Sequence, residues 1–264
     1  MRIFYYPGCA SQHLARELHR AVEALFMALE LEISILEDWN CCGAREIARF
    51  PPTVGWFLAT RNLALAEEGI LITTCSLCYH NLKRTSRALQ KYPEALQHIN
   101  DILREEGLRY RPERLQILHL LEFLCKKENL ARLVSEVKGR GEKIPVVSFY
   151  GCFLSRPFPL ESGLMEKLLD ISGFEVKPYS LAHYCCGGHL PRTDSPVIRE
   201  LCTRLLLAAE RTGARFMGVC CPVCKTNLEI YGPRKDLKVV YLPQLLGMRL
   251  GLPPAITGLE GGLI

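Results

Sequence analysis

Cysteine is the residue that most constrains this chain, because it recurs twice in the same order. The chain has 264 residues, and 13 of them are cysteine. Ten form two sets, each with a single cysteine, then Cys-Cys-Gly, then Cys-x-x-Cys. These ten are Cys9, Cys41, Cys42, Cys75 and Cys78 in the first set and Cys152, Cys185, Cys186, Cys221 and Cys224 in the second.

The spacing and surroundings of the cysteines repeat as well. The gaps are 31 and 32 residues in the first set and 32 and 34 in the second. Residues 6–9 (YPGC) resemble residues 149–152 (FYGC), and residues 75–82 resemble residues 221–228. An internal repeat means two copies of one structural unit.

The repeat predicts two domains, residues 1–135 and 136–264. Their boundary is expected in residues 127–143, which are charged and contain two glycines. Similar apolar strings, residues 115–120 and 237–242, close the two halves.

Hydrophobic patterning predicts alternating strands and helices in each half. Strands are expected at residues 2–6, 33–36, 70–73, 145–149, 174–176 and 216–219. Helices are expected at residues 12–29, 54–68 and 195–212, and each Cys-x-x-Cys should open a further helix. This βαβαβα order, twice over, predicts two tandem pseudo-symmetric α/β units, each a small, largely parallel sheet with flanking helices.

Most of the patterned cysteines directly follow a predicted strand. They are therefore expected in loops at the carboxyl ends of the strands, where open α/β sheets bind ligands. The ten cysteines should gather at two sites, one per repeat.

Five thiols in each half favour an iron–sulfur cluster over zinc. Thiolates are soft ligands that suit zinc, copper(I) and iron–sulfur clusters. A zinc site closes with four ligands, and two adjacent thiols serve one small ion poorly because neighbouring side chains diverge. The glycine after each pair should let the backbone approach the cluster, and N–H groups at the Cys-x-x-Cys helix start should favour its negative charge.

Other interpretations of the cysteines stay open at this point. The ten are also compatible with buried thiols, redox disulfides or zinc in one half. Cys125, Cys202 and Cys220 have no counterpart in the repeat. Cys125 and Cys202 are expected in the core, and Cys220 is not expected to be a ligand because its equivalent in the first half is Thr74.

Composition indicates a soluble globular protein without a nucleic-acid motif. The net charge of +5 is small, and the 48% hydrophobic content is ordinary. No apolar run reaches the ~18 residues of a transmembrane helix. The amino terminus lacks the pattern of a signal peptide, and we expect a cytoplasmic location.

Local strings resemble one family closely. Residues 36–44 (LEDWNCCGA), Gly151-Cys152 with Arg156-Pro157 downstream, and residues 241–247 (YLPQLLG) are similar to the B subunit of heterodisulfide reductase, in the CCG (cysteine-rich) domain family. The resemblance extends over residues 1–252.

The resemblance implies an oxidoreductase acting on sulfur groups. Each unit would hold one noncubane [4Fe-4S] cluster through its five cysteines. The two clusters would flank a disulfide, such as that of coenzyme M and coenzyme B, which is reductively cleaved or oxidatively formed. Keeping all ten cysteines favours this two-cluster catalytic form.

Polar residues near the motifs are candidates for supporting roles. Asn81 and Asn227 recur at matching places and are expected to support the cluster ligands. Trp39 and His183 precede the cysteine pairs and are expected to shield or pack. The candidates for substrate contact are His13, Arg45, His80, Arg156, His189 and Lys225.

The chain lacks an electron supply of its own. It has no ferredoxin cysteine run and no glycine-rich dinucleotide fingerprint. The resemblance therefore implies an iron–sulfur electron-donor partner, similar to the C subunit of heterodisulfide reductase, and a flavin-containing partner similar to its A subunit. The alternatives are a non-catalytic electron-transfer or docking subunit of a succinate, glycolate or lactate oxidoreductase, and a structural zinc module.

Overall fold

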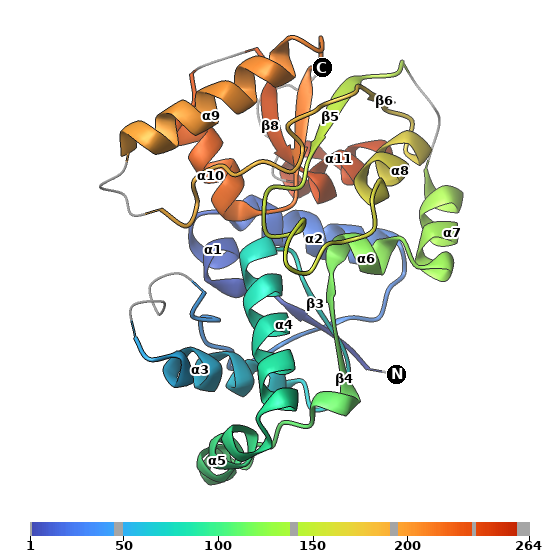
Figure 1. The fold of residues 1–264 in the computed structure, drawn as a ribbon. Helices are drawn as coiled ribbons and strands as arrows, with labels where there is room; N and C mark the ends of the chain where they lie inside the picture. The colour runs from blue at the N-terminus through green and yellow to red at the C-terminus, as the bar shows by residue number, and fades with distance from the viewer. Residues whose placement is uncertain (1, 45–49, 138–141, 191–194, 234–235, 258–264) are drawn as a thin grey trace. The chain divides into compact units, whose positions relative to one another are not determined.

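The computed structural model describes most of the chain as helices and strands around two parallel sheets (Figure 1). The predicted α/β fold class is confirmed. The described residues are 2–44, 50–137, 142–190, 195–233 and 236–257.

The first sheet has four parallel strands in the order β2-β1-β3-β4. They are β1 (Ile3–Tyr6), β2 (Ser34–Ile35), β3 (Gly69–Thr73) and β4 (Leu115–His119). In register, Tyr6 at the end of β1 lies beside Thr73 at the end of β3. Cys9, in the first turn of α1 and not in the expected loop, and Cys75, in the loop after β3, therefore lie at the same end of the sheet.

The second sheet repeats this topology, in the order β6-β5-β7-β8. Its strands are β5 (Pro145–Phe149), β6 (Glu175–Val176), β7 (Phe216–Val219) and β8 (Lys238–Tyr241). Phe149 lies beside Val219, as Tyr6 lies beside Thr73. The loops with Cys152 and Cys221 thus share an edge too, and the sequence repeat corresponds to a repeat of structure.

The central strands are apolar because helices cover both faces of a parallel sheet. Ile70, Leu71 and Ile72 of β3 are all at most 2% exposed, and so are Phe216 and Met217 of β7. Their side chains, which alternate between the two faces, make the core of each unit.

The helices connect the strands and follow the prediction with some differences. The predicted helix 12–29 is two helices, α1 and α2, and the apolar strings that close the halves are the edge strands β4 and β8. The helical elements are α1 (Gly8–His13), α2 (Arg16–Ala28), α3 (Pro52–Leu65), α4 (Ser76–Lys91), α5 (Pro93–Leu103), η2 (Arg104–Glu106), η3 (Pro112–Arg114), α6 (Leu120–Leu124), α7 (Lys127–Glu136), α8 (Leu164–Ile171), α9 (Ser195–Glu210), α10 (Pro222–Tyr231), α11 (Leu242–Arg249) and α12 (Pro254–Thr257).

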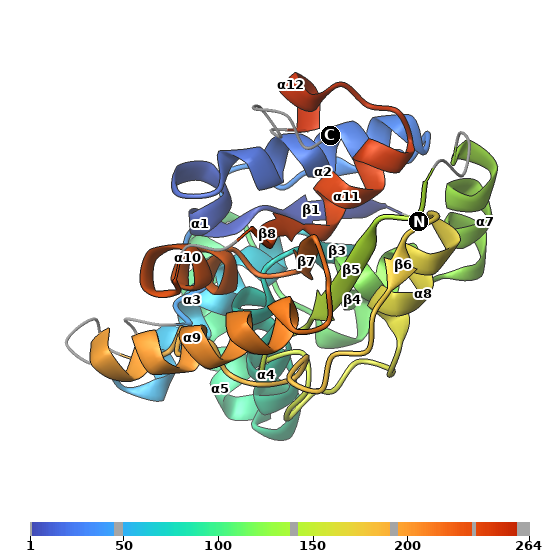
Figure 2. The ribbon, with the colours of Figure 1, turned by 90° about the horizontal axis from the view of Figure 1, so that it is seen from above.

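By packing, the chain divides into two compact units that differ from a division at residue 135. The first unit comprises residues 1–9 and 32–120, and the second comprises residues 10–31 and 121–264. Helix α2 explains the difference, because its buried face packs against α11 and α12 of the second unit (Figure 2). All five cysteines of each patterned set lie in one unit.

Candidate metal centres

In the first unit, the five patterned cysteines converge where three strands end. The Sγ atoms of Cys9 and Cys41 are 3.7 Å apart, and those of Cys42 and Cys78 are 3.4 Å apart. Cys41 is also in hydrogen-bonding contact with Cys42, and Cys78 with Cys75. Five thiols from three separate segments of the sequence therefore form one cluster of sulfur atoms.

The second unit repeats this arrangement. The Sγ atoms of Cys152 and Cys185 are 3.7 Å apart, and those of Cys186 and Cys224 are 3.3 Å apart. Cys224 is in contact with Cys221. The same pairs form in both units: the single cysteine with the first of the adjacent pair, and the second of the pair with the last cysteine.

The two sites are also oriented alike with respect to solvent. Cys9 and Cys41 are exposed, and Cys152 and Cys185 are partly exposed, whereas the other six patterned cysteines are buried. Cys75 and Cys221 are the N-cap residues of α4 and α10. The positive end of a helix therefore lies beside the buried thiols of each site.

One thiol in each set is strongly acidified. Hydrogen bonding with Cys42 and Cys9, together with the N–H of Gly43, lowers the pKa of Cys41 to about 2. In the second unit, hydrogen bonds from Cys152 and from the N–H of Gly187 lower the pKa of Cys185 to about 5, against the opposing effect of burial.

The pKa values of several neighbouring thiols are raised. The hydrogen bond with Cys41 raises the pKa of Cys42 to about 12, and contact with Cys41 also raises the pKa of Cys9. Contact with Cys185 raises the pKa of Cys152 in the same way, and contact with Cys186 raises that of Cys224. Five crowded thiols oppose each other's ionisation, because like charges repel in a buried site.

This donor set fits a multi-iron cluster. Metal ligation needs thiolates, so a group that brings several positive charges would offset the repulsion among them. Soft sulfur ligands suit iron–sulfur clusters. In addition, the Ser76 hydroxyl, next to Cys75, is buried and has no hydrogen-bond partner among the described residues, as expected beside a site that binds a further group.

The glycine before the first cysteine of each set touches the last cysteine. Gly8 and Gly151 both have positive φ, +74° and +69°. A Cβ at Gly8 would lie 3.2 Å from Cys78 Sγ, and one at Gly151 would lie 3.1 Å from Cys224 Sγ. Glycine is therefore required at both positions for the turn and for the space beside the sulfur.

The glycine after each cysteine pair lies in a turn with positive φ. Gly43 and Gly187 have φ values of +75° and +77°. A Cβ at Gly187 would lie 3.2 Å from the Ile198 side chain of α9. At Gly187, the turn conformation and packing against a helix both favour glycine, and the approach of the backbone to a cluster stays a prediction.

Two asparagines hold the cysteine pairs from equivalent positions. Asn81 of α4 donates from Nδ2 to the Cys42 carbonyl oxygen at 2.5 Å, and Asn227 of α10 donates to the Cys186 carbonyl at 3.0 Å. The recurrence in sequence thus corresponds to one recurring bond, which fixes the second cysteine of each pair.

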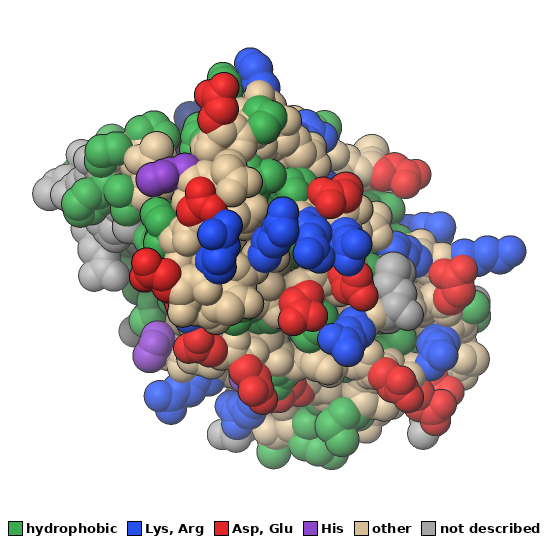
Figure 3. Space-filling view, turned by 90° about the horizontal axis from the view of Figure 1, so that it is seen from below, with side chains coloured by type: hydrophobic (Ala, Val, Ile, Leu, Met, Phe, Trp, Pro, Cys, Tyr) green, Lys and Arg blue, Asp and Glu red, His purple; other side chains and the backbone are tan. Residues whose placement is uncertain are grey.

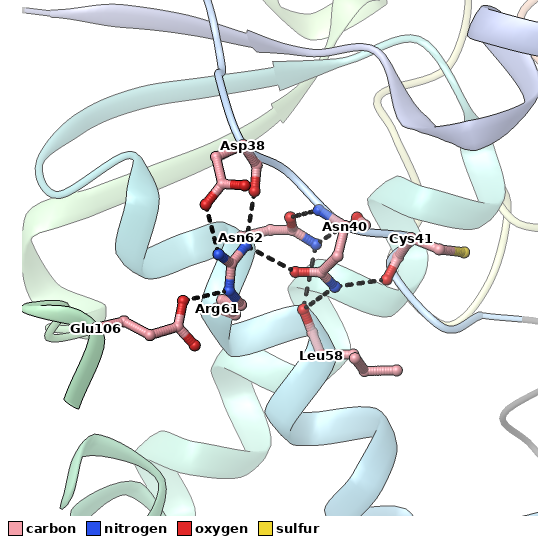
Figure 4. A network of polar contacts seen from close by, with 7 residues as sticks. All are labelled: Asp38, Asn40, Cys41, Leu58, Arg61, Asn62 and Glu106. Atoms are coloured by element: carbon pink, nitrogen blue, oxygen red, sulfur yellow. Dashed lines mark hydrogen bonds and ion pairs between the residues drawn. The ribbon is translucent and has the colours of Figure 1, made fainter. Parts of the chain in front are cut away.

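The loop before Cys41 is held by a polar network from α3 (Figure 4). The Asn40 N–H donates to Asn62 Oδ1, and Asn62 Nδ2 donates to the Asn40 carbonyl, both at 2.9 Å. Arg61 donates to the Asp38 carbonyl and carboxylate at 2.6 Å and pairs with Glu106 at 2.7 Å. Neither Arg61 nor Asn62 was predicted from the sequence, because both lie on a helix distant along the chain from the cysteines they support.

The residue two positions before each cysteine pair packs against an aromatic ring. Trp39 packs edge-on against Tyr6, with ring centroids 5.5 Å apart. His183 stacks on Tyr150 at 4.8 Å, and its Nδ1 lies 2.7 Å from the Ser155 hydroxyl. Trp39 is half-buried, whereas His183 is exposed and so is not in the core, and shielding of a cluster by either residue stays a prediction.

The residues predicted to contact substrate lie in different environments. His189 lies 3.5 Å from Cys185 Sγ. His80 is half-buried, and burial lowers its pKa. His13 and Arg156 are exposed, and Arg45 lies outside the described residues.

Lys225 has a structural role that was not expected. Its ammonium pairs with Glu229 at 2.6 Å and with Glu17 at 3.6 Å, and it lies over the Tyr241 ring. These contacts join α10 to α2 within the second unit, and substrate contact by Lys225 stays a prediction.

The three unpatterned cysteines are buried or half-buried, and burial raises the pKa of each. Cys202 lies closer to a site than its sequence suggested, because its thiol donates to the Cys186 carbonyl at 3.6 Å. Cys125 donates to the Leu164 carbonyl at 3.6 Å.

The surface carries both signs of charge. On the face in Figure 3, a short row of Lys and Arg side chains lies among Asp and Glu side chains, in keeping with a net charge of +5. Within the ranges described above, no helix combines the length and apolarity needed to cross a membrane.

Two α/β units, each with a parallel sheet and a five-thiol site, define a class of tandem-repeat, cysteine-rich proteins. The model of the cysteine-rich domain, CCG, matches residues 3–83 and 146–229. The chain belongs to the CCG cysteine-rich domain family, as the resemblance predicted.

Curated relatives match the chain over nearly its whole length. The 8-methylmenaquinol:fumarate reductase membrane anchor subunit of Wolinella succinogenes is 29% identical, over 98% of this chain and 96% of that protein. The B subunit of the ferredoxin:CoB-CoM heterodisulfide reductase of Methanosarcina mazei is 25% identical, over 98% of this chain and 92% of that protein.

A solved structure shares the fold. The crystal structure of a hypothetical protein from Helicobacter pylori matches 97% of this chain with a TM-score of 0.75 and 16% sequence identity. This chain spans about half, 51%, of the length of that one. At this identity the likeness concerns the fold alone.

Proposed function

We propose that this protein is the catalytic iron–sulfur subunit of a heterodisulfide-reductase-type complex. It would bind two noncubane [4Fe-4S] clusters and reductively cleave, or oxidatively form, a disulfide such as coenzyme M–coenzyme B. The relatives support the coarser statement, a subunit of an oxidoreductase complex with cysteine-bound iron–sulfur clusters. The cluster type, the substrate and a cytoplasmic location belong to the proposal.

One observation carries this proposal: five thiols converge in the same pairwise arrangement in each of the two units. A chain in which one site had lost cysteines would support a single cluster. Complete donor sets in both units favour two equivalent centres, which could each deliver one of the two electrons that cleavage of a disulfide needs.

The chain's own groups have defined roles in this proposal. In each unit the five cysteines would hold the cluster, and the N-terminus of α4 or α10 would stabilise its negative charge. Asn81 and Asn227 fix the backbone of the second cysteine of each pair. The exposed cysteines, Cys9 and Cys41, mark the side from which a substrate would reach the first site.

The overall reaction needs partners. A disulfide, two electrons and two protons give two thiols. Bound clusters supply one-electron transfer and iron atoms that act as Lewis acids toward sulfur. The electrons would come from an iron–sulfur donor subunit, with a flavin-containing subunit further off.

An anaerobic assay tests the catalytic proposal. Purified, iron-loaded protein should reduce a coenzyme M–coenzyme B disulfide with reduced viologen as donor and release two thiols per disulfide. A C78A/C224A double variant serves as the control and should be inactive. Full iron loading in both sites without turnover of this disulfide, or of other small disulfides, would contradict the catalytic assignment.

A second candidate is a non-catalytic electron-transfer or docking subunit. It is favoured by the 29% identical relative, whose name is that of a membrane anchor subunit. This function predicts clusters that cycle between redox states with a quinol-linked or dicarboxylate-linked partner. Loaded protein that lacks disulfide turnover and co-purifies with a flavoprotein dehydrogenase would support it.

A further inference from the structure

The second site has a histidine in direct contact with one of its thiols. His189 Nδ1 lies 3.5 Å from Cys185 Sγ, and Gly187 N lies 3.2 Å from the same sulfur. The three residues belong to one short loop, in which the Leu190 N–H donates to the Gly187 carbonyl at 2.9 Å. Backbone and imidazole therefore approach the sulfur from the same loop.

We propose that His189 donates a hydrogen bond to the Cys185 thiolate and thereby raises the reduction potential of the cluster in the second unit. This inference rests on the proposed cluster binding and assigns His189 a positioning and tuning role in place of the substrate contact expected from sequence.

The direction of the bond follows from the chemistry of the ligand. A thiolate that binds iron carries no proton and is only an acceptor. The proton of this bond must then be on Nδ1 of the imidazole. The proposed role of this bond is to tune electron transfer to the cluster from the donor subunit.

The sign of the effect follows from charge. A reduced cluster carries one more negative charge than an oxidised one, so a donor to its sulfur stabilises the reduced form more. Hydrogen bonds to the sulfurs are among the factors that set the reduction potential of iron–sulfur clusters. A second donor beside Gly187 therefore raises the potential.

The His189 ring also has an aromatic contact. The Phe153 ring meets the His189 ring edge-on, with centroids 6.5 Å apart and an interplanar angle of 88°. Phe153 directly follows Cys152, whose Sγ lies 3.7 Å from Cys185 Sγ. The two residues that flank the sulfur pair thus contact each other.

The imidazole distinguishes the two repeats. The position four residues after Cys41 is Arg45, whereas the position four residues after Cys185 is His189. Both repeats keep the five cysteines, the glycine after the cysteine pair and the supporting asparagine, so this difference falls beside an equivalent set of ligands.

An EPR-monitored redox titration of the iron-loaded protein tests the proposal. His189→Phe keeps an aromatic ring against Phe153 and removes the donor, so one of two cluster midpoint potentials should fall while the other stays. His189→Asn restores an N–H near the Nδ1 position and should recover most of the shift. His98→Phe is the control, because His98 is an exposed histidine of α5 in the other unit, and it should leave both midpoints unchanged.

A measurement on the wild-type protein makes the test independent of variant folding. Pulsed EPR with isotope-labelled histidine should detect an imidazole nitrogen coupled to one cluster. Clusters without this coupling, or His189→Phe protein with unchanged midpoints, would overturn the inference while the proposed function stands. Wild-type protein that binds no iron would overturn the proposed function itself.

Discussion

At the scale of single residues, the two sites are defined by residues at equivalent positions of the two repeats. The two residues at each such pair of positions have the same structural role. Gly8 and Gly151 give space to the last cysteine of each set, and Asn81 and Asn227 hold the second cysteine of each adjacent pair. All four were visible in the repeat, because the need for a particular side chain recurs with the site. Their partners were not visible, since a hydrogen bond to a carbonyl leaves no trace in sequence.

Replacing Gly151 with alanine should lower the free energy of unfolding and the amount of iron that the protein binds. The positive φ alone costs about 1–2 kcal/mol for a residue with a Cβ, and the new atom would also press on Cys224 Sγ at 3.1 Å. Gly213→Ala is the control, because its φ is +75° and nothing lies within 4 Å of its Cβ position. Urea unfolding and iron analysis should show both losses for Gly151→Ala and only the smaller stability loss for the control.

Asn81→Ala should destabilise the first unit by about 1–3 kcal/mol, because a buried carbonyl loses its donor. Asn81 is 2% exposed, and its Oδ1 also accepts from Arg84 at 3.1 Å. Gln97→Ala removes an exposed side chain that bonds Asp101, and it should change stability by less than about 0.5 kcal/mol. Equal effects of the two substitutions in chemical denaturation would contradict the role assigned to Asn81.

At the scale of elements, the cysteines are positioned by strands that end together and by helices that begin beside them. Sequence patterning predicted the first three strands of each unit, because buried parallel strands are short apolar runs bounded by turns. It left the edge strands β4 and β8 as similar strings, since a four- or five-residue apolar run is ambiguous on its own. The network from α3 to the Cys41 loop depends on tertiary packing, so no local pattern predicted it.

Asn62→Ala should release the loop that carries Cys41 and Cys42. Asn62 makes both hydrogen bonds to the Asn40 backbone and is fully buried. Asn100→Ala is a matched control, because Asn100 makes the same two kinds of bond to the Tyr110 backbone, away from the cysteines. Iron analysis should show a loss near half of the total for Asn62→Ala, whereas full loading would contradict the network's role.

At the scale of the whole molecule, the duplication explains the two sheets and the two five-thiol sites. The sequence repeat was sufficient to predict both, because each repeat contains the elements that position its cysteines. The assignment of α2 was not predictable, since its apolar stripe specifies that it is buried and leaves open which unit buries it. In the structure, that face packs on α11 and α12, so residues 10–31 belong to the second unit.

Leu25→Ala in α2 should therefore destabilise the second unit, although it lies in the first repeat of the sequence. Leu25 is fully buried, and a leucine-to-alanine change in a core costs about 2–5 kcal/mol. Met27 is 80% exposed, and Met27→Ala should have little effect. Hydrogen exchange should show reduced protection in β5 and β7, and a loss confined to β1 and β3 would contradict the division.

The central claim is that each unit binds its own multi-iron cluster through its five cysteines. The most direct test is iron and sulfide analysis, with EPR, of anaerobically purified wild-type protein and of the C78A and C224A variants. We predict about eight irons per wild-type chain, about half in each variant, and the loss of a different EPR signal in each. Zinc without iron, or two variants that lose the same signal, would contradict the account.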